Sequence, residues 1–216
     1  MELLGCYGVS LVDSVAVTTE EDAVTAAGRF GGPVALKADV PRLVVRRKGA
    51  GAVLLDLHGA DEVRRGYHSL RETFAGRLSG FIVQPMITGG VEVKISVLEE
   101  QVFGPLVLLG LAGATANVLA DRAARLAPLT GSDADDLIRS VRAAPLLLGR
   151  PGESAAGLAS LKDMLLRVSQ LADDLPQVAE LELSPIIVRR DDTVPVDARI
   201  RIQPDRPADA YLRQLP

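Results

Sequence analysis

Hydrophobic and polar residues alternate most regularly near the end of the chain, between residues 178 and 200. Within two runs, 178–188 and 194–200, hydrophobic side chains recur at every second position, which is the period of a half-buried strand. They are Ala179, Leu181 and Leu183 in the first run, and Val194, Val196, Ala198 and Ile200 in the second. A short polar connection separates the runs, and two such runs joined in this way predict an antiparallel hairpin. In matching register, the hairpin would carry three oxygen-bearing side chains on one face: Glu182, Ser184 and Asp197.

The rest of the chain predicts a mixture of helices and strands. Thr19 is placed to cap a helix that ends at Gly31, and Ser132 or Asp133 is placed to cap another. Helical spacing of hydrophobic residues predicts two further helices, at 60–78 and 153–175. Strands are expected at 33–37, 53–57, 81–84, 91–97 and 103–109. This irregular order predicts an α+β (mixed α/β) protein rather than a doubly wound parallel sheet.

Composition limits the class of protein. The 216 residues are 48% hydrophobic and 24% charged, which is a globular balance. A net charge of −4 argues against nucleic-acid binding, which would need a basic stripe. The long uncharged stretch 102–120 is interrupted by glycine and proline, so it predicts a buried strand and a loop rather than a membrane span. We expect a soluble, cytoplasmic protein whose one cysteine, Cys6, stays reduced.

Three features of the sequence suggest sites that bind a metal ion or phosphate groups. The oxygen row on the terminal hairpin suits Mg²⁺, although carboxylates on a strand also form ordinary solvated faces. Lys37 ends a buried strand, where it could meet phosphates or simply reach water. Arg46 and Arg47 belong to a basic, glycine-rich turn that could cover phosphates or form a solvated loop.

Several strings occur in a characteristic order along the chain. They are PVALK at 33–37, VQPMITGGVE at 83–92, FGP at 103–105, GLAG at 110–113, RLAPL at 125–129, LIRSVR at 137–142, SQLA at 169–172 and AELELSP at 179–185. Together they resemble the ATP-grasp domain of the NDP-forming (ADP-forming) acyl-CoA synthetases, which is related to the β subunit of succinyl-CoA synthetase. The resemblance covers residues 2–202.

This resemblance implies an ATP-grasp fold, with two lobes built on antiparallel sheets and a nucleotide cleft between them. Residues 1–16 and 91–202 would form the larger lobe, which carries the metal face, and residues 17–90 the smaller. Residues 203–216 would form a loosely ordered tail. The family uses ATP and Mg²⁺, and it works with a CoA-binding or ligase domain or subunit.

The resemblance also implies residue roles. Lys37 would contact the phosphates, Gln84 to Met86 would form the adenine hinge, and Glu92 would lie near the ribose. The Mg²⁺ face would consist of Glu182, Ser184 and Asp197.

The chain departs from the family pattern at several motif positions. No histidine occurs between Met1 and Leu57, where the family usually has one before a glycine turn. The other departures are Pro85 for the hinge acid, Ala112 for a glycine, Asn117 for a glutamate and Ser184 for the metal-binding asparagine. A phosphohistidine relay cannot use a residue that is not a nucleophile. Two functions therefore stay open: the nucleotide-binding domain of a CoA ligase, or a non-catalytic regulatory or CoA-ester-sensing module, for instance fused to an acetyltransferase.

Overall fold

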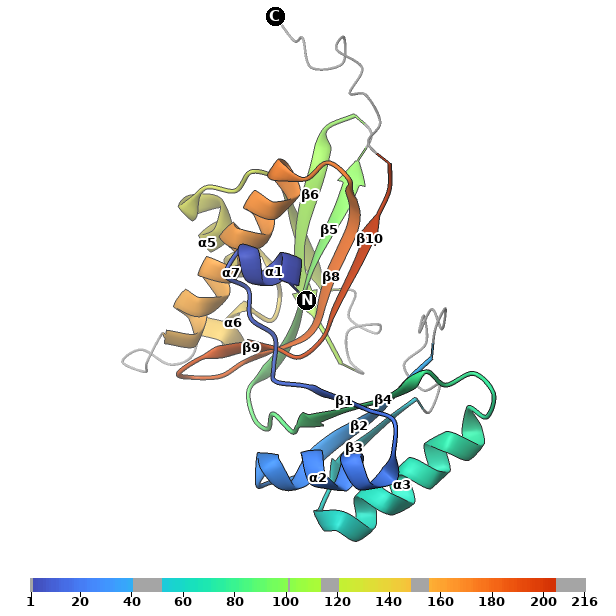
Figure 1. Ribbon diagram of the computed structural model, residues 1–216. Coiled ribbons are helices and arrows are strands. Elements are labelled where there is room, and N and C mark those ends of the chain that lie inside the picture. The colour runs from blue at the N-terminus through green and yellow to red at the C-terminus, as the bar shows by residue number, and fades with distance from the viewer. Residues whose placement is uncertain (1, 41–51, 101, 114–120, 149–155, 205–216) are drawn as a thin grey trace, which may run out of the picture. The chain divides into compact units, whose positions relative to one another are not determined.

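The structure is a computed structural model that describes residues 2–40, 52–100, 102–113, 121–148 and 156–204. It divides into two compact units, which we call the small unit (Val12–Thr88) and the large unit (Met1–Leu11 and Gly89–Pro216). In each unit, helices cover one face of an antiparallel sheet (Figure 1). Both helices and strands are abundant, and the α+β class predicted from the sequence is confirmed.

The small unit contains four strands and two helices among its described residues, 12–40 and 52–88. In chain order they are β1 (Val15–Val17), α2 (Glu20–Phe30), β2 (Val34–Asp39), β3 (Val53–Leu57), α3 (Gly59–Thr73) and β4 (Gly80–Pro85). The sheet order is β1-β4-β2-β3, with every pair antiparallel. As predicted, Thr19 caps α2 by accepting a 3.1 Å hydrogen bond from the N–H of Asp22, and Gly31 ends the helix at φ 66°.

The large unit contains a six-stranded sheet and four helices within the part of the chain that is described. They are α1 (Glu2–Cys6), β5 (Val91–Glu100), β6 (Gly104–Leu111), β7 (Arg122–Leu126), α5 (Gly131–Ser140), α6 (Ala144–Leu148), α7 (Ala156–Asp174), β8 (Val178–Val188), β9 (Thr193–Pro195) and β10 (Ala198–Ile202). The sheet order is β10-β8-β5-β6-β7, and β9 pairs with the far end of β8. All of its pairs are antiparallel.

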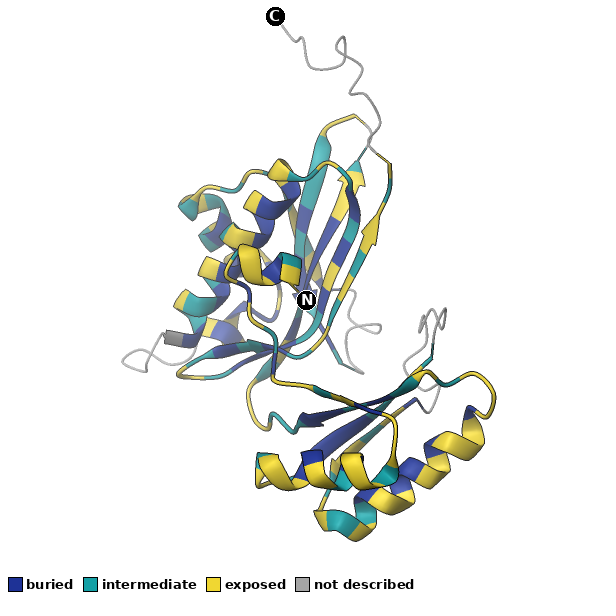
Figure 2. Cartoon of the chain, viewed as in Figure 1, coloured by how far each residue is buried: buried dark blue, intermediate teal, exposed yellow. Residues whose placement is uncertain are grey.

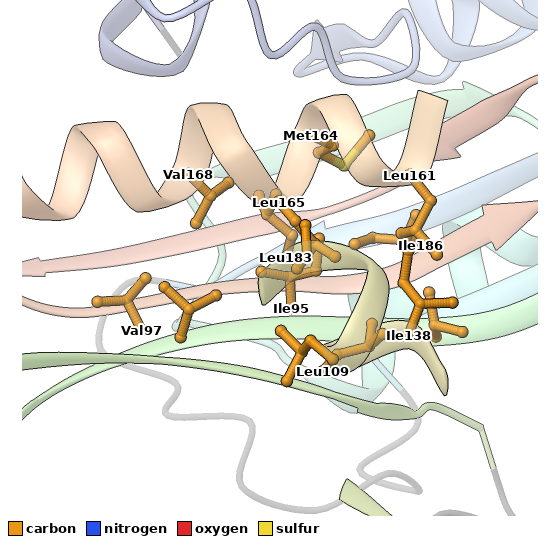
Figure 3. Close-up of a cluster of buried hydrophobic side chains, with 14 of the residues drawn as sticks. Ile95, Val97, Leu109, Ile138, Leu161, Met164, Leu165, Val168, Leu183 and Ile186 are labelled. Atoms are coloured by element: carbon orange, nitrogen blue, oxygen red, sulfur yellow. The ribbon is translucent and has the colours of Figure 1, made fainter. Parts of the chain in front are cut away.

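The core of the large unit lies between the sheet and the helices. The hydrophobic side chains of helix α7 pack against β5, β6 and β8 (Figure 3). The fully buried residues of this layer include Ile95, Leu109, Leu161, Leu165, Leu183 and Ile186. Burial follows the helix-facing sides of both sheets, while the outer sides of the helices are exposed (Figure 2). Helices and sheet are therefore held together chiefly by burial of apolar surface.

Some boundaries differ from the sequence predictions. The units divide after Leu11 and after Thr88, whereas divisions after residues 16 and 90 were predicted. Strand β1 belongs to the small unit because it pairs with β4, with Ala16 opposite Ile82. The predicted tail falls mostly on residues 205–216, which lie outside the described residues.

The cap of helix α5 lies two or three residues before the predicted caps. Thr130 caps it, and the side chain of Asp133 accepts a hydrogen bond from the Thr130 N–H in return. This reciprocal arrangement satisfies two main-chain donors that would otherwise have no partner, so the predicted caps Ser132 and Asp133 lie inside the helix. None of the described helices is long and apolar enough to cross a membrane.

Candidate functional site

The six-stranded sheet has a second face, opposite to the helices, that we call the outer face. Alternation along the strands puts even-numbered residues of β5, β6 and β7 on this face, because their odd-numbered neighbours lie in or against the core. Its polar residues include Glu92 and Lys94 from β5, Arg122 from β7, and Glu180, Glu182 and Ser184 from β8. The three residues predicted for the metal face, Glu182, Ser184 and Asp197, all belong to the large unit.

Strand β8 carries a bulge at the end of the oxygen row. Val93 lies opposite Ile186 and Ile95 lies opposite Leu183, so Lys94 alone faces two residues of β8, Ser184 and Pro185. The extra residue reverses the alternation: Leu183 and Ile186 both point to the core. The row of outward-facing oxygen side chains in β8 therefore ends at Ser184.

The structure brings Asp197 beside Ser184. The Ser184 N–H donates a 3.1 Å hydrogen bond to the Asp197 carbonyl, one step beyond the pair of Leu183 and Ala198. The predicted second strand is divided here into β9 and β10, and Asp197 lies between them. Since Pro185 has no N–H to give, an uninterrupted ladder cannot form at this point. Ser184 and Asp197 are thus neighbours, and Glu182 lies two residues from Ser184 along the same strand.

Lys94 is a member of this group that the sequence interpretation missed. Its ammonium lies 3.6 Å from the carboxylate of Glu182. On the other side of Glu182, Arg199 of β10 occupies the directly opposite position. Alternation along β5 places Lys94 on the outer face, but only the register of β5 with β8 makes it a diagonal neighbour of Glu182.

Gly110 keeps the neighbouring part of the outer face free of side-chain bulk. It lies between Lys94 and Arg122 in the register of β5, β6 and β7. A Cβ at Gly110 would lie 2.6 Å from the carbonyl oxygen of Asp121, so a larger residue could fit only if the strands moved.

The buried Asp121 carboxylate accepts hydrogen bonds from the N–H groups of Arg142 (2.7 Å) and Ala143 (2.8 Å), which joins the start of β7 to the α5–α6 connection.

The remaining predicted residues that the structure describes lie in the small unit or at the start of β5. Lys37 and Gln84 occupy the sheet face opposite to α2 and α3, because Ala35 pairs with Gln84 while Leu36 enters the core. Lys37 is half-buried and Gln84 is buried. The main-chain N–H of Met86 donates to the carbonyl of Pro33 at 2.9 Å. The structure thus brings Lys37 and Gln84 together on one face, with Met86 just past the end of β4.

Two of the candidate residues, Arg46 and Arg47, lie outside the described residues. Glu92 is exposed on β5, and its carbonyl accepts a 2.9 Å hydrogen bond from the N–H of Ala112. That bond links the start of β5 to the strand that carries Gly110.

Comparison with known proteins decides the family. A sequence family described as an ATP-grasp domain matches residues 1–202. This chain is an ATP-grasp domain. It resembles the β subunit of acetate–CoA ligase [ADP-forming] I from Pyrococcus furiosus, with 31% identity over 92% of this chain and 88% of that protein.

Two further comparisons support this family. The 4-hydroxybutyrate–CoA ligase [ADP-forming] of Nitrosopumilus maritimus is 32% identical over 87% of the ATP-grasp domain, which corresponds to 27% of that longer protein. The dinucleotide-forming acetyl-coenzyme A synthetase 1 of Ca. Korarchaeum cryptofilum was solved in complex with coenzyme A, Ca-AMPCP and HgCl⁺. It superposes with a TM-score of 0.85 and 31% identity, covering 94% of this chain and 90% of that one. The resemblance to ADP-forming acyl-CoA synthetases is therefore confirmed.

The outer face of the ATP-grasp domain offers suitable donors for Mg²⁺. Glu182 and Asp197 supply carboxylate oxygens and Ser184 supplies a hydroxyl, the hard donors that Mg²⁺ prefers. Among the described residues, no group of three His, Cys, Asp or Glu side chains is arranged to hold a metal. A metal bound here would therefore complete its coordination with water or with phosphate oxygens, as Mg²⁺ commonly does.

Proposed function

We propose that this ATP-grasp domain binds Mg·ATP and serves as the nucleotide-binding part of an ADP-forming acyl-CoA synthetase. Lys37 contacts the phosphates, Gln84 and Met86 hold the adenine, and Glu92 lies near the ribose. The metal is held by Glu182, Ser184 and Asp197. Arg46 and Arg47 are further candidates for the phosphates.

The contact between Ser184 and Asp197 is the main support for this assignment. These residues are 13 positions apart in the chain, and a 3.1 Å main-chain hydrogen bond joins the Ser184 N–H to the Asp197 carbonyl. A row of oxygen donors on one rigid sheet can orient Mg²⁺ with little reorganisation. Bound there, Mg²⁺ would supply charge neutralisation for the nucleotide phosphates.

Lys37 supplies a second, independent cation for the phosphates. Lys37 belongs to β2, which lies between β3 and β4 in the sheet. It is opposite Val53 of β3 and Ile82 of β4, so strands on both sides hold its main chain in place. A lysine in this position acts as a point charge on a fixed strand, which suits a phosphate group. Gln84, from the adjacent strand, offers an amide that can donate to and accept from a base edge.

The acyl-CoA chemistry requires a partner in this proposal. The family resemblance implies a phosphorylated histidine, and His58 and His68 are the two histidines of this chain. His58 lies 3.2 Å from the carboxylate of Asp56, and His68 lies 2.9 Å from that of Glu20. Neither belongs to the basic turn where the resemblance implies a histidine. We assign the histidine, the CoA site and the acid site to a CoA-binding or ligase domain or subunit that works with this one, in the cytoplasm.

The departures from the family motifs favour a second candidate. Where the family usually has a histidine and a lysine before a glycine turn, this chain has the run Val45-Arg46-Arg47-Lys48. Neither a valine nor an arginine can serve as the nucleophile that becomes phosphorylated. A domain that binds the nucleotide without transferring phosphate would serve as a regulatory or CoA-ester-sensing module. Its nucleotide site would be the one described above.

Calorimetric titration with Mg·ATP tests the shared part of both functions. The Lys37→Ala variant is expected to bind about tenfold or more weakly, since a contact to a charged group contributes about 1.5–3 kcal/mol. Lys162→Ala is the matched control, because it removes the same charge from an ion pair with Asp135 on the helix side of the large unit. Equal heats from wild type and Lys37→Ala would rule out the nucleotide assignment. ADP release upon addition of acid, CoA and ATP to the domain with its partner separates the two functions, since only a ligase produces it.

A further inference from the structure

Lys94 and Glu182 form an ion pair in the middle of the proposed metal face. The ammonium lies 3.6 Å from Oε2 of Glu182, and the two side chains are 41% and 48% exposed. Lys94 is the residue that faces the β8 bulge, where Ser184 and Pro185 together oppose it. The Lys94 ammonium group therefore lies next to Glu182 and Ser184, two of the three predicted metal ligands.

Glu182 is surrounded by basic residues on both neighbouring strands. Arg199 lies directly opposite it on β10, and side chains in directly opposite positions share a face of the sheet. On the other side of Lys94, Gly110 of β6 lies opposite Lys94, and Arg122 of β7 lies opposite Gly110. A divalent cation that approaches Glu182 therefore meets the ammonium of Lys94 close to the carboxylate, on a face that also carries the acidic residues Glu92 and Glu180.

We propose that Lys94 competes with the divalent cation for Glu182. In the absence of nucleotide, the ammonium neutralises the carboxylate and weakens metal binding. When phosphates accompany the metal, they offer the ammonium another partner, so the metal can take Glu182 without leaving Lys94 unpaired. Lys94 thus makes metal binding depend on nucleotide, an inference that builds on the metal face assigned above.

The competition is electrostatic and local. Two cations cannot both lie close to one carboxylate without repelling each other, and the repulsion at a few ångströms is much stronger than that from charges beyond about 10 Å, which salt screens. Because the ion pair is largely exposed, removing the ammonium is expected to change metal affinity only by about two- to fivefold. The effect is small but specific to this position.

Manganese binding without nucleotide provides the test, because free Mn²⁺ can be counted by its electron paramagnetic resonance signal. Lys94→Met is expected to bind Mn²⁺ about two- to fivefold more tightly than wild type, and Lys94→Arg to behave like wild type. Lys162→Met is the matched control, since it removes an ammonium that pairs with Asp135 at 2.6 Å between α7 and α5. It should leave Mn²⁺ affinity unchanged. Adding Glu182→Gln to Lys94→Met should abolish the gain.

Three results would overturn the inference: unchanged affinity in Lys94→Met, equal gains in Lys94→Met and Lys162→Met, or a gain that survives Glu182→Gln. Absence of Mn²⁺ binding in every variant would also overturn it, because no competition would then exist. The titration contains no nucleotide, so its outcome does not depend on the Lys37 experiment. Loss of the Lys37 effect with a retained Lys94 effect would overturn the nucleotide assignment alone.

Discussion

The main-chain N–H of Ser184 and the carbonyl oxygen of Asp197 are joined by a 3.1 Å hydrogen bond where strand β8 bulges. This bond fixes how far Asp197 lies from the end of the oxygen row. The contact uses only main-chain atoms, and the Asp197 carboxylate accepts a separate 3.0 Å hydrogen bond from the Ala198 N–H. The identity of the side chain at 184 can therefore be changed without removing the bond.

Ser184→Asn is expected to strengthen binding of Mg²⁺·ADP. The family resemblance implies an asparagine at this position, and its longer side chain would reach a metal that the serine hydroxyl meets only through water. Since Mg²⁺ demands ligand distances of about 2.0–2.1 Å, the direct ligand should improve affinity by on the order of tenfold. Calorimetry at fixed Mg²⁺ concentration measures the change.

Ser184→Leu is the control for that substitution, because leucine is similar in size to asparagine and has no oxygen. It is expected to bind Mg²⁺·ADP no better than wild type. If the asparagine and leucine variants bind equally well, the side chain at 184 does not reach the metal.

The sequence predicted most strands and helices because their local patterns were complete. The run 178–188 contains an alternating stretch from Ala179 to Ser184, and the whole run forms β8. Strand β7 was missed, since Arg122–Leu126 is rich in alanine and arginine and has little strand preference of its own. It forms because β6 presents an edge to it, with Leu106 opposite Leu126. Tertiary pairing, which the local sequence does not encode, determines this element.

The candidate site was predictable as a set of residues but not as an arrangement. Glu182 and Ser184 share a face by simple alternation, whereas the contact of Asp197 with Ser184 depends on the register in which β8 pairs with β10. The contact of Lys94 with Glu182 likewise depends on the register in which β5 pairs with β8. The Thr130 cap, by contrast, had a readable signal, because an acidic residue follows it three positions later at Asp133.

Gly157→Ala is expected to destabilise the large unit. A Cβ at Gly157 would overlap the carbonyl oxygen of Arg189 and lie 2.9 Å from that of Asp192. The main chain cannot easily retreat, because the carbonyl of Gly157 accepts a 2.6 Å hydrogen bond from the hydroxyl of Thr193. Overpacking of this kind typically costs about 1–3 kcal/mol. Urea denaturation followed by circular dichroism measures the loss.

Gly131→Ala is the matched control for the Gly157 substitution, since Gly131 also lies at the start of a helix in the large unit. A Cβ there would meet only the end of the Lys162 side chain, at 3.8 Å. The free energy of unfolding should stay within about 0.5 kcal/mol of wild type. Similar losses in both variants would mean that the close approach at Gly157 has no special cost.

Asp192→Asn is expected to lower thermal stability near neutral pH and to have little effect in acid. In the turn between β8 and β9, the Arg189 guanidinium makes two hydrogen bonds to the Asp192 carboxylate, of 2.7 and 2.5 Å. These hydrogen bonds lower the pKa of Asp192 below its ordinary value of 3.8, against the smaller opposing effect of burial. A carboxyl whose pKa is lower in the folded state stabilises the fold above its unfolded pKa, and this contribution is lost as the pH falls through the folded pKa. The difference in melting temperature between wild type and Asp192→Asn should therefore be constant above about pH 5 and shrink below about pH 4.

Asp191→Asn is the control, because it removes the same charge from the same turn while the Arg189–Asp192 contact stays in place. Its effect on the melting temperature should be smaller. A difference for Asp192→Asn that persists unchanged down to pH 2 would show that the ionised contact with Arg189 does not stabilise the turn.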